Sequence, residues 1–499
     1  MELQFSNQGY DCLQSALWED KTEELTQEYR LSDGMPDIGS MIGAWGQVMV
    51  RSKEWQDRKI SVSGGVTAWA MYTPENGDAP ESVEIWIPFR MQWELPQTNR
   101  DGSIIVSCKV KSVDARSVSA RRILFRAVIS VTGEALAPTQ IQIYKPIDVP
   151  EDIQLLYKKY PMRLPIEAGE KAFVLDEELT LSVEADGATK LIRCCVQPEI
   201  IDKKIMADKA VFRGTAILDI LCRCDDGNIA RQSFEIPFSQ FAELSREFGP
   251  GASLFVQMAL TSAEPELLED GCVRVKIGML GQYVVYDSEM VEIVEDAYST
   301  KRNVELQTEM LEIPALLEEK QERIRAEQPI DVEDEMPIDM GLLLGNPEIY
   351  HDFDNVGINL SGTFHYMSAD QNNVLHGSAA PWKHMLEMSA EQKTRVYAWS
   401  QLTGKPQMAQ TPEGTVLRQD VLLETRTVSA EPMQMICALT LGDMQQTDDL
   451  RPSLILCRPG EKSLWELAKE NRSTMDAIRQ LNELTDEPLE NDMLLIPVV

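Results

Sequence analysis

The stretch Ala210-Val-Phe-Arg-Gly-Thr-Ala-Ile-Leu-Asp-Ile-Leu-Cys222 places a glycine inside an otherwise largely apolar run. Its opening recurs as Ile60-Ser-Val-Ser-Gly64 and as Ile358-Asn-Leu-Ser-Gly362. The glycines lie 150 residues apart (64 to 214) and 148 residues apart (214 to 362). Self-similarity at a fixed period is typical of a repeated domain. The sequence therefore predicts three copies of one fold.

Further landmarks recur in the same order along the chain. They are Ile87-Pro-Phe89, Ile236-Pro-Phe238 and, more loosely, Ala380-Pro-Trp382; Pro198-Glu-Ile200 and Pro347-Glu-Ile349; and Asp33-Gly-Met-Pro36 and Asp334-Glu-Met-Pro337. These matches set the expected domain boundaries. We expect a first repeat over 1–148, a second over 149–303, a third over 304–448, and a separate C-terminal domain over 450–499.

Each repeat is predicted to be rich in β-strands. The run Ile123 to Val131 sends every second, apolar residue to one face, and Val273 to Met279 alternates in the same way. This period of two is typical of half-buried strands. The recurring glycine inside a strand indicates a bulge or the close approach of another backbone. The expected fold class is mainly β, with three antiparallel sandwich or barrel-like domains.

Two short helices are predicted to interrupt the sheets. One lies near residues 239–246 and the other near 312–327. The second is rich in charge and is interpreted as an acidic linker helix at the start of the third repeat. Its charged residues form either a solvated face or a docking face.

The last forty-odd residues predict a small βααβ domain. Leu454 to Cys457 reads as a first strand and Met493 to Ile496 as the closing strand. Ser463 followed by Glu466 has the spacing of a capping box at the start of a helix. A second helix is expected from Ser473, with Met475, Ile478 and Leu481 as its buried stripe and Asn482 at its end.

This C-terminal pattern resembles the LysM family. The matches are Gly460, Ser463-Leu-Trp465, Leu467-Ala468, Ile478, Leu481-Asn482 and Leu495-Ile-Pro497. The first turn is one residue longer than usual, and Asn491-Asp492 replaces the later Gly-Gln of the family. Both departures lie in the loops that form the sugar groove in members that bind N-acetylglucosamine polymers.

The predicted binding surface lies on two loops of this domain, because binding groups usually sit on loops carried by a rigid scaffold. Trp465 and Leu489 would be anchors if exposed, whereas Trp465 could instead pack inside the domain. The candidate ligand- or partner-binding residues are Gly460, Glu461, Lys462, Ser463, Leu464, Trp465, Leu484, Leu489 and Asn491.

Composition excludes several classes of function. The 499 residues include 47 basic and 81 acidic side chains, a net charge of −34, which disfavours nucleic acid or an anionic membrane as partner. No apolar stretch reaches the length of a membrane span and no export signal is found, so the chain is expected in the cytoplasm. The nine cysteines are interpreted as free thiols. No metal site, cofactor or catalytic residue is predicted, since nucleophile motifs and phosphate loops are missing and no histidine precedes His351.

The three repeats followed by a LysM-like tail resemble the SPOCS-domain proteins, and among them the SipL-like spore coat morphogenesis proteins. The most specific residues are Gly34-Met-Pro-Asp-Ile-Gly39, Trp45-Gly46 and the recurring Ile-Pro-Phe. The resemblance implies a noncatalytic scaffold in the mother-cell cytoplasm that is recruited to the forespore surface. There it would bind a coat-basement ATPase of the SpoIVA type through its LysM and SPOCS domains.

A second hypothesis is a glycan-binding protein. In it the LysM-like domain binds peptidoglycan or spore cortex through N-acetylglucosamine units, and Gly460 with Ser463-Leu464 motivates it. Two features favour the scaffold: the repeats are predicted to stay in the cytosol, and the first turn of the tail is lengthened.

Overall fold

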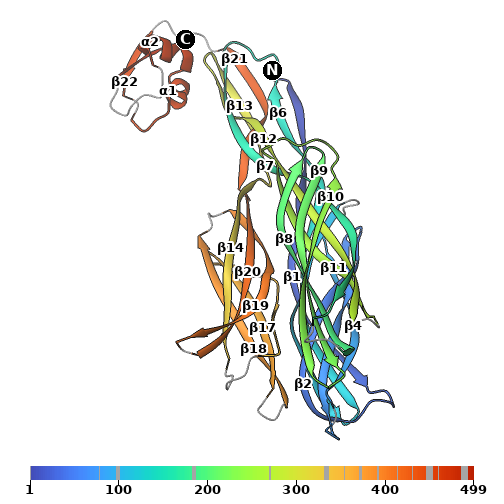
Figure 1. Cartoon of the computed structure of the whole chain (residues 1–499). Helices are drawn as coiled ribbons and strands as arrows, with labels where there is room; N and C mark the ends of the chain where they lie inside the picture. Colours follow the sequence, from blue (N-terminus) through green and yellow to red (C-terminus); the bar gives the residue numbers. More distant parts are fainter. Residues whose placement is uncertain are drawn as a thin grey trace.

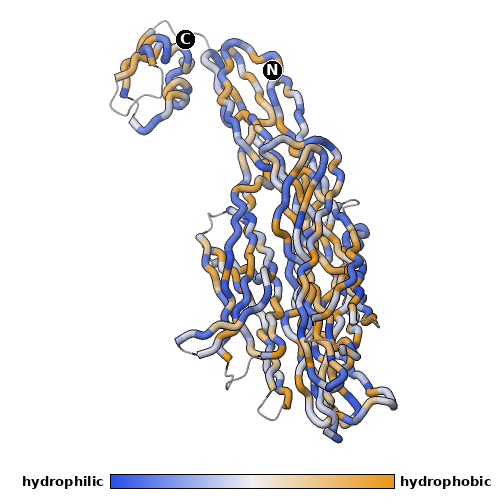
Figure 2. The backbone as a smooth tube through the Cα atoms, viewed as in Figure 1, coloured by the Kyte–Doolittle hydropathy of each residue, from blue (hydrophilic) through white to orange (hydrophobic). Residues whose placement is uncertain are grey.

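A computed structural model shows a mainly β protein with two short helices near the C-terminus, which confirms the predicted fold class (Figure 1). The structure describes residues 2–77, 79–96, 102–182, 187–268, 271–330, 337–352, 355–369, 374–389, 393–412, 414–429, 431–444, 453–458, 460–484 and 493–498. Apolar and polar positions alternate along the strands (Figure 2). This pattern lets each sheet bury one face.

The first repeat contains two three-stranded antiparallel sheets, with strand orders β2-β3-β4 and β1-β6-β5. Their inward-facing side chains form one core, which includes Val66, Ile87 and Phe125. The strands are β1 (Phe5–Arg30), β2 (Ile38–Gln56), β3 (Lys59–Pro74), β4 (Glu81–Glu94), β5 (Ser103–Ser119) and β6 (Arg122–Pro146).

The second repeat has the same order of strands. Its sheets run β8-β9-β10 and β7-β12-β11, and Phe212, Leu218 and Val275 lie in their shared core. The strands are β7 (Ile153–Thr180), β8 (Ala188–Met206), β9 (Lys209–Cys224), β10 (Ile229–Glu243), β11 (Ser253–Leu267) and β12 (Cys272–Ser299).

The third repeat has the same plan with three interrupted strands, one of which is divided into β20 and β21. The strand equivalent to β2 and β8 is split into β15 and β16, which pair with consecutive parts of β17 and have Pro347 between them. Pro314 likewise lies between β13 and β14. Proline has no backbone N–H to give to a ladder and so favours a break, but it does not require one, because Pro198 lies inside the unbroken edge strand β8. The strands are β13 (Arg302–Glu312), β14 (Leu316–Pro329), β15 (Asp339–Leu344), β16 (Glu348–Asp352), β17 (Asn355–Ala369), β18 (Leu375–Ser389), β19 (Thr394–Thr411), β20 (Gly414–Ser429) and β21 (Pro432–Met444).

The three recurring glycines occupy equivalent positions. Gly64, Gly214 and Gly362 pair with Val50, Ile200 and Leu344. A Cβ atom at each glycine would overlap the backbone carbonyl oxygen of the residue before that partner, namely Met49, Glu199 and Leu343. Register shifts beside Gly64 and Gly214 mark β-bulges. The predicted close approach of another backbone is therefore found at all three glycines, and a bulge lies beside two of them.

Both predicted helices within the repeats are wrong. Residues 239–243 complete strand β10, and the acidic segment expected as a linker helix over 312–327 forms the end of β13 and most of β14. In β14, Ile324 and Ala326 point into the core while charged residues face outward. Cross-strand pairing with β20, including the Glu327–Arg418 ion pair at 2.7 Å, overrides the helical preference of the glutamates.

One end of the molecule is built from three two-stranded antiparallel arms, one from each repeat. The paired ends of β1 with β6, of β7 with β12, and the pair β13 with β21 pack against one another there (Figure 1). Two hydrophobic clusters lie between these arms. One includes Ile143, Leu164 and Ile293, and the other includes Val294 and Leu439. The repeats are thus joined by common hydrophobic cores at this end.

Buried and half-buried polar contacts also link the repeats in a closed ring. Lys53 of the first repeat donates to the side chain of Gln282 in the second, at 2.8 Å. Lys203 of the second repeat binds Glu424 of the third. Lys203 and Lys53 occupy equivalent positions, because each lies three residues after the partner of a recurring glycine, Ile200 or Val50. Arg426 of the third binds Glu134 of the first at 2.7 Å.

Candidate docking site

The C-terminal unit folds as two strands and two helices in the order βααβ. Strand β22 pairs antiparallel with β23, and Leu456 lies directly opposite Leu495. The side chains of Leu464, Leu467, Ile478 and Ile496 form its core. The elements are β22 (Leu454–Cys457), α1 (Leu464–Glu470), α2 (Met475–Asn482) and β23 (Leu494–Pro497).

The start of α1 has the predicted capping box. The Ser463 hydroxyl accepts from the Glu466 backbone N–H at 3.3 Å, and the Glu466 carboxylate accepts from the Ser463 backbone N–H at 2.8 Å. These two bonds satisfy amides that have no partner within the helix. Gly460, in the turn before, has a φ of +58°, a backbone conformation that favours glycine.

Three details of α2 differ from the prediction. Its N-cap is Thr474 rather than Ser473, because Ser473 is buried and its carbonyl accepts a bond from another part of the chain. Glu483, not Asn482, takes the left-handed conformation at the C-terminal end. The Asn482 side chain instead bonds both the N–H and the C=O of Leu495, which holds β23 against the helix. Leu481, predicted to be buried, is exposed.

The unit packs on the end of β12. Trp465 donates its indole N–H to Asp296 at 2.8 Å, and the Lys469 ammonium lies 2.6 Å from the same carboxylate. The Tyr298 hydroxyl donates to the Ser473 carbonyl at 2.8 Å, and the Tyr298 and Trp465 rings meet edge to face. Burial within this contact raises the pKa of Tyr298. Trp465 is 7% exposed, so it serves an internal interface.

The structure places the nine predicted binding residues in different environments. Gly460, Glu461, Lys462 and Ser463 lie together on one exposed turn. Leu464 and Trp465 are buried, and Leu484 is half-buried against the core of the unit. Leu489 and Asn491 lie outside the described residues. Of the two predicted anchors, Trp465 is therefore unavailable to a partner in this arrangement.

An apolar surface that the sequence analysis missed covers the outer side of the two-stranded sheet. Leu454, Leu456 and Leu495 are 50%, 59% and 39% exposed, and strand alternation puts them on the face opposite the buried Leu494 and Ile496. We call these three residues the outer leucine face. The signal was present in the sequence, because both strands are apolar at every position instead of at alternate ones.

With Met493 and Leu481, the described residues of this unit include five large apolar side chains that are exposed. Met493 and Leu481 are 51% and 43% exposed. Exposed apolar groups scattered singly need no explanation, but a cluster on a small unit marks an interaction site. The outer leucine face is therefore the strongest candidate docking surface of the unit.

The described residues include neither a metal-binding cluster nor an exposed thiol. No three His, Cys, Asp or Glu side chains among them gather in a way that could hold a metal ion. All nine cysteines are free and none is exposed; Cys222 and Cys224 both lie in the core of the second repeat. Burial raises the pKa of the Cys222 thiol to about 11, which makes it a poor nucleophile. The two helices of the described residues, seven and eight residues long, are too short to cross a bilayer.

These features describe a multi-repeat β protein with a small helical unit at one end and an apolar surface on that unit. Residues 188–266, from β8 into β11, match the family described as SipL, SPOCS domain. That match points to spore coat morphogenesis, since the family is a spore coat assembly family and not a known enzyme family. No LysM domain is detected by the same comparison. No curated protein and no solved structure matches the chain.

Asp296 is expected to hold the C-terminal unit in place. Replacing it by Ala removes the acceptor of Trp465 and of Lys469 and leaves a buried indole N–H without a partner. We expect the amides of α1 to exchange hydrogen about tenfold faster, which corresponds to roughly 1.4 kcal/mol. Hydrogen exchange followed by mass spectrometry measures this rate.

The matched control is Lys462→Gln, which removes the exposed ion pair with Glu470 and is expected to leave the exchange rate unchanged. Equal exchange in D296A and the native protein would show that the contact does not hold the unit.

Proposed function

We propose that this protein is a noncatalytic scaffold of spore coat assembly that acts in the mother-cell cytoplasm and is recruited to the forespore surface. Its partner there would be a coat-basement ATPase of the SpoIVA type. The SPOCS match over residues 188–266 supports the coat role. The proposal assigns docking to the C-terminal unit, with the SPOCS repeats as its platform.

The observation that carries this proposal is the outer leucine face on a unit anchored by its opposite side. Trp465 and Lys469 bind β12, whereas Leu454, Leu456 and Leu495 remain exposed. An anchored unit presents such a surface at a fixed position, which lowers the entropy lost when a partner binds. Partly exposed leucines on a pair of strands suit a partner with a complementary apolar groove.

We also propose that the C-terminal unit is a LysM module. The βααβ order, the capping box at Ser463 and the closing Leu495-Ile-Pro497 support this assignment. Under the scaffold hypothesis, this module binds a protein partner. The net charge of −34 over the whole chain supports a protein partner more than nucleic acid or an anionic membrane.

A fluorescent fusion of the full chain in sporulating cells tests the proposed function. We expect signal concentrated around the forespore, and even signal through the mother cell for the double variant Leu456→Asp/Leu495→Asp. The matched control is Val174→Asp, which changes a 65% exposed residue on β7 and is expected to localise normally. Native fusion spread evenly through the cell would contradict the coat role. Normal localisation of the double variant would contradict docking through the outer leucine face.

The second candidate function is binding of peptidoglycan or cortex glycan by the same unit. The exposed turn from Gly460 to Ser463 favours it, because that turn corresponds to the sugar-groove loop of the LysM family. Retention of the full chain on purified peptidoglycan, lost in Gly460→Trp but kept in L456D/L495D, would support it. Absence of retention by the native chain would remove it.

A further inference from the structure

A cavity of about 260 Å³ lies where the three repeats meet. The first repeat contributes Gln47 and Lys109, the second Arg193 and Gln257, and the third His365 and Ser400. The cavity lies away from the C-terminal unit, and none of its lining residues belongs to that unit. We call it the central cavity. Its volume is close to the lower end of small-molecule sites.

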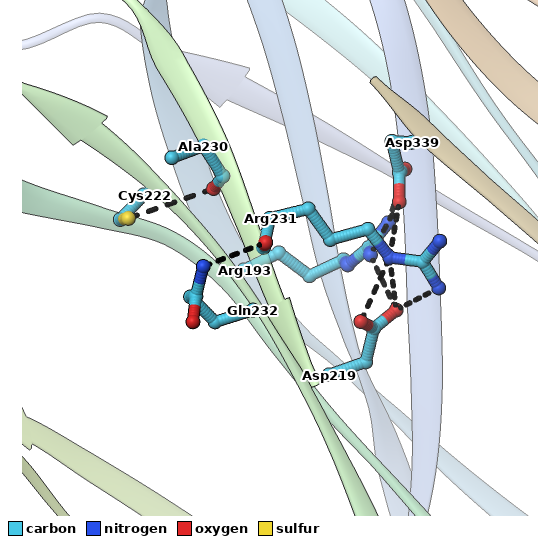
Figure 3. A network of polar contacts seen from close by, with 7 residues as sticks. All are labelled: Arg193, Asp219, Cys222, Ala230, Arg231, Gln232 and Asp339. Atoms are coloured by element: carbon cyan, nitrogen blue, oxygen red, sulfur yellow. Dashed lines mark hydrogen bonds and ion pairs between the residues drawn. The ribbon is translucent and has the colours of Figure 1, made fainter. Parts of the chain in front are cut away.

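One wall of the central cavity is an electrically balanced network (Figure 3). Arg193 binds both oxygens of Asp339, at 2.6 and 2.8 Å, and Arg231 binds Asp219 at 2.8 Å. Arg193 also reaches Asp219 at 3.1 Å. Two guanidinium groups face two carboxylates, and the neighbouring Arg193 holds the pKa of Asp339 below its usual range. This wall therefore carries no net charge.

In its protonated form, Lys109 adds a positive charge that this network does not balance. Its ammonium donates to the hydroxyl of Ser400 at 2.6 Å and to the carbonyl of the same residue. These neutral oxygens are its hydrogen-bond partners among the described residues. The carboxylate of Asp20 is near enough to act electrostatically but accepts its hydrogen bond from Thr132. Burial lowers the pKa of Lys109 to about 7, as expected for an ammonium without a paired anion.

Two residues that line the central cavity have a buried polar atom with no hydrogen-bond partner among the described residues. These atoms are the Nε of Arg193 and the Nδ1 of His365. Burial lowers the pKa of His365 to about 4, so the ring is neutral at pH 7. Arg193 Nε–H can only donate a hydrogen bond. Unpaired buried groups of this kind indicate a missing partner, and a donor requires an acceptor atom.

The rest of the lining is largely apolar. Val48, Val110, Ile217, Met258 and Leu342 come from all three repeats. A ligand that fits this surface has an apolar body, and one that satisfies Lys109 and Arg193 Nε has an anionic oxygen acceptor. A free inorganic anion would leave the apolar walls without contacts.

We propose that the central cavity binds a small organic carboxylate with a short hydrocarbon chain. The carboxylate accepts a charge-assisted hydrogen bond from Lys109, and the chain lies against the apolar walls. Because the lining comes from all three repeats, such a ligand would also hold them together. This site is separate from the outer leucine face and does not depend on the proposed docking function.

Titration calorimetry of the full chain with octanoate tests this proposal. We expect saturable binding of octanoate, and binding at least about tenfold weaker for octanol, which lacks the anion, and for inorganic phosphate, which lacks the chain. Lys109→Met should weaken octanoate binding by a similar factor, and Lys109→Arg, which keeps the charge, should retain most of it. Circular dichroism of each variant shows whether it is folded.

Two results would overturn the proposal. One is the absence of octanoate binding to the native chain at millimolar concentration. The other is equal binding of octanoate and octanol, which would show that the cavity takes any apolar molecule and that Lys109 does not recognise an anion. The comparison of these two ligands uses only the native chain, so it decides the point even if K109M fails to fold.

Discussion

Replacing Arg426 by Met is expected to destabilise the folded chain by about 3–5 kcal/mol, the cost of leaving one partner of a buried ion pair alone. Arg426 and Glu134 are 0% and 2% exposed and belong to the third and first repeats. The Arg426 guanidinium also bonds the hydroxyl of Tyr286 and lies 4.2 Å from the centre of the Phe255 ring, both in the second repeat. One side chain thus contacts all three repeats.

Urea denaturation of the full chain, followed by circular dichroism, measures this change. The double variant Arg426→Met/Glu134→Leu should recover most of the lost stability, because removing both charges leaves no unpaired ion. The control is Arg274→Gln, which breaks an exposed pair with Asp176 and should cost less than about 1 kcal/mol. If R426M lowered the free energy of unfolding no more than R274Q does, the buried pair would not join the repeats.

Replacing Gly214 by Ala is expected to cost about 3 kcal/mol or more, although it adds only one methyl group. That methyl would overlap the carbonyl oxygen of Glu199 and press on the Phe238 ring, and the backbone of a paired strand cannot move aside freely. Gly64→Ala should lower the stability by a similar amount, because its Cβ would meet the equivalent carbonyl oxygen of Met49 and the ring of Phe89.

The matched control is Gly249→Ala in the same repeat, where no atom lies within 4 Å of the added Cβ. We expect a change within about 0.5 kcal/mol there. Denaturation midpoints of the three variants measure the comparison. If G214A proved as stable as G249A, the recurring glycines would not be needed for close strand approach, and the repeat would need another explanation.

The sequence predicted the β class, the recurring glycine and the C-terminal unit because each depends on local pattern. Gly64, Gly214 and Gly362 could be recognised from spacing alone. The helix expected over 312–327 failed for the opposite reason: glutamates favour helix locally, but β14 pairs with β20, a strand about a hundred residues away. Local propensity does not contain that information.

The candidate site was predicted only in part. The turn from Gly460 to Ser463 is exposed as expected, whereas Trp465 is covered by Asp296 and Tyr298, about 170 residues earlier in the chain. No local signal could reveal that contact. The outer leucine face could have been found from the sequence, since Leu454 to Cys457 is apolar on both faces of a strand.

The interlocked repeats give the C-terminal unit a firm base. Shared cores at the two-stranded arms and the ring of contacts through Lys53, Lys203 and Arg426 make independent motion of one repeat costly. The unit then packs on β12 near these arms. A scaffold benefits from this arrangement, because a docking surface on a rigid base is already positioned for its partner.

Binding of the purified full chain to a purified SpoIVA-type ATPase, measured by biolayer interferometry, tests the central claim most directly. We predict that Leu456→Asp/Leu495→Asp weakens binding at least about 30-fold, as loss of an apolar hot spot of roughly 2 kcal/mol requires, while Val174→Asp binds like the native chain. Native affinity of the double variant, or no binding by the native chain, would contradict the account.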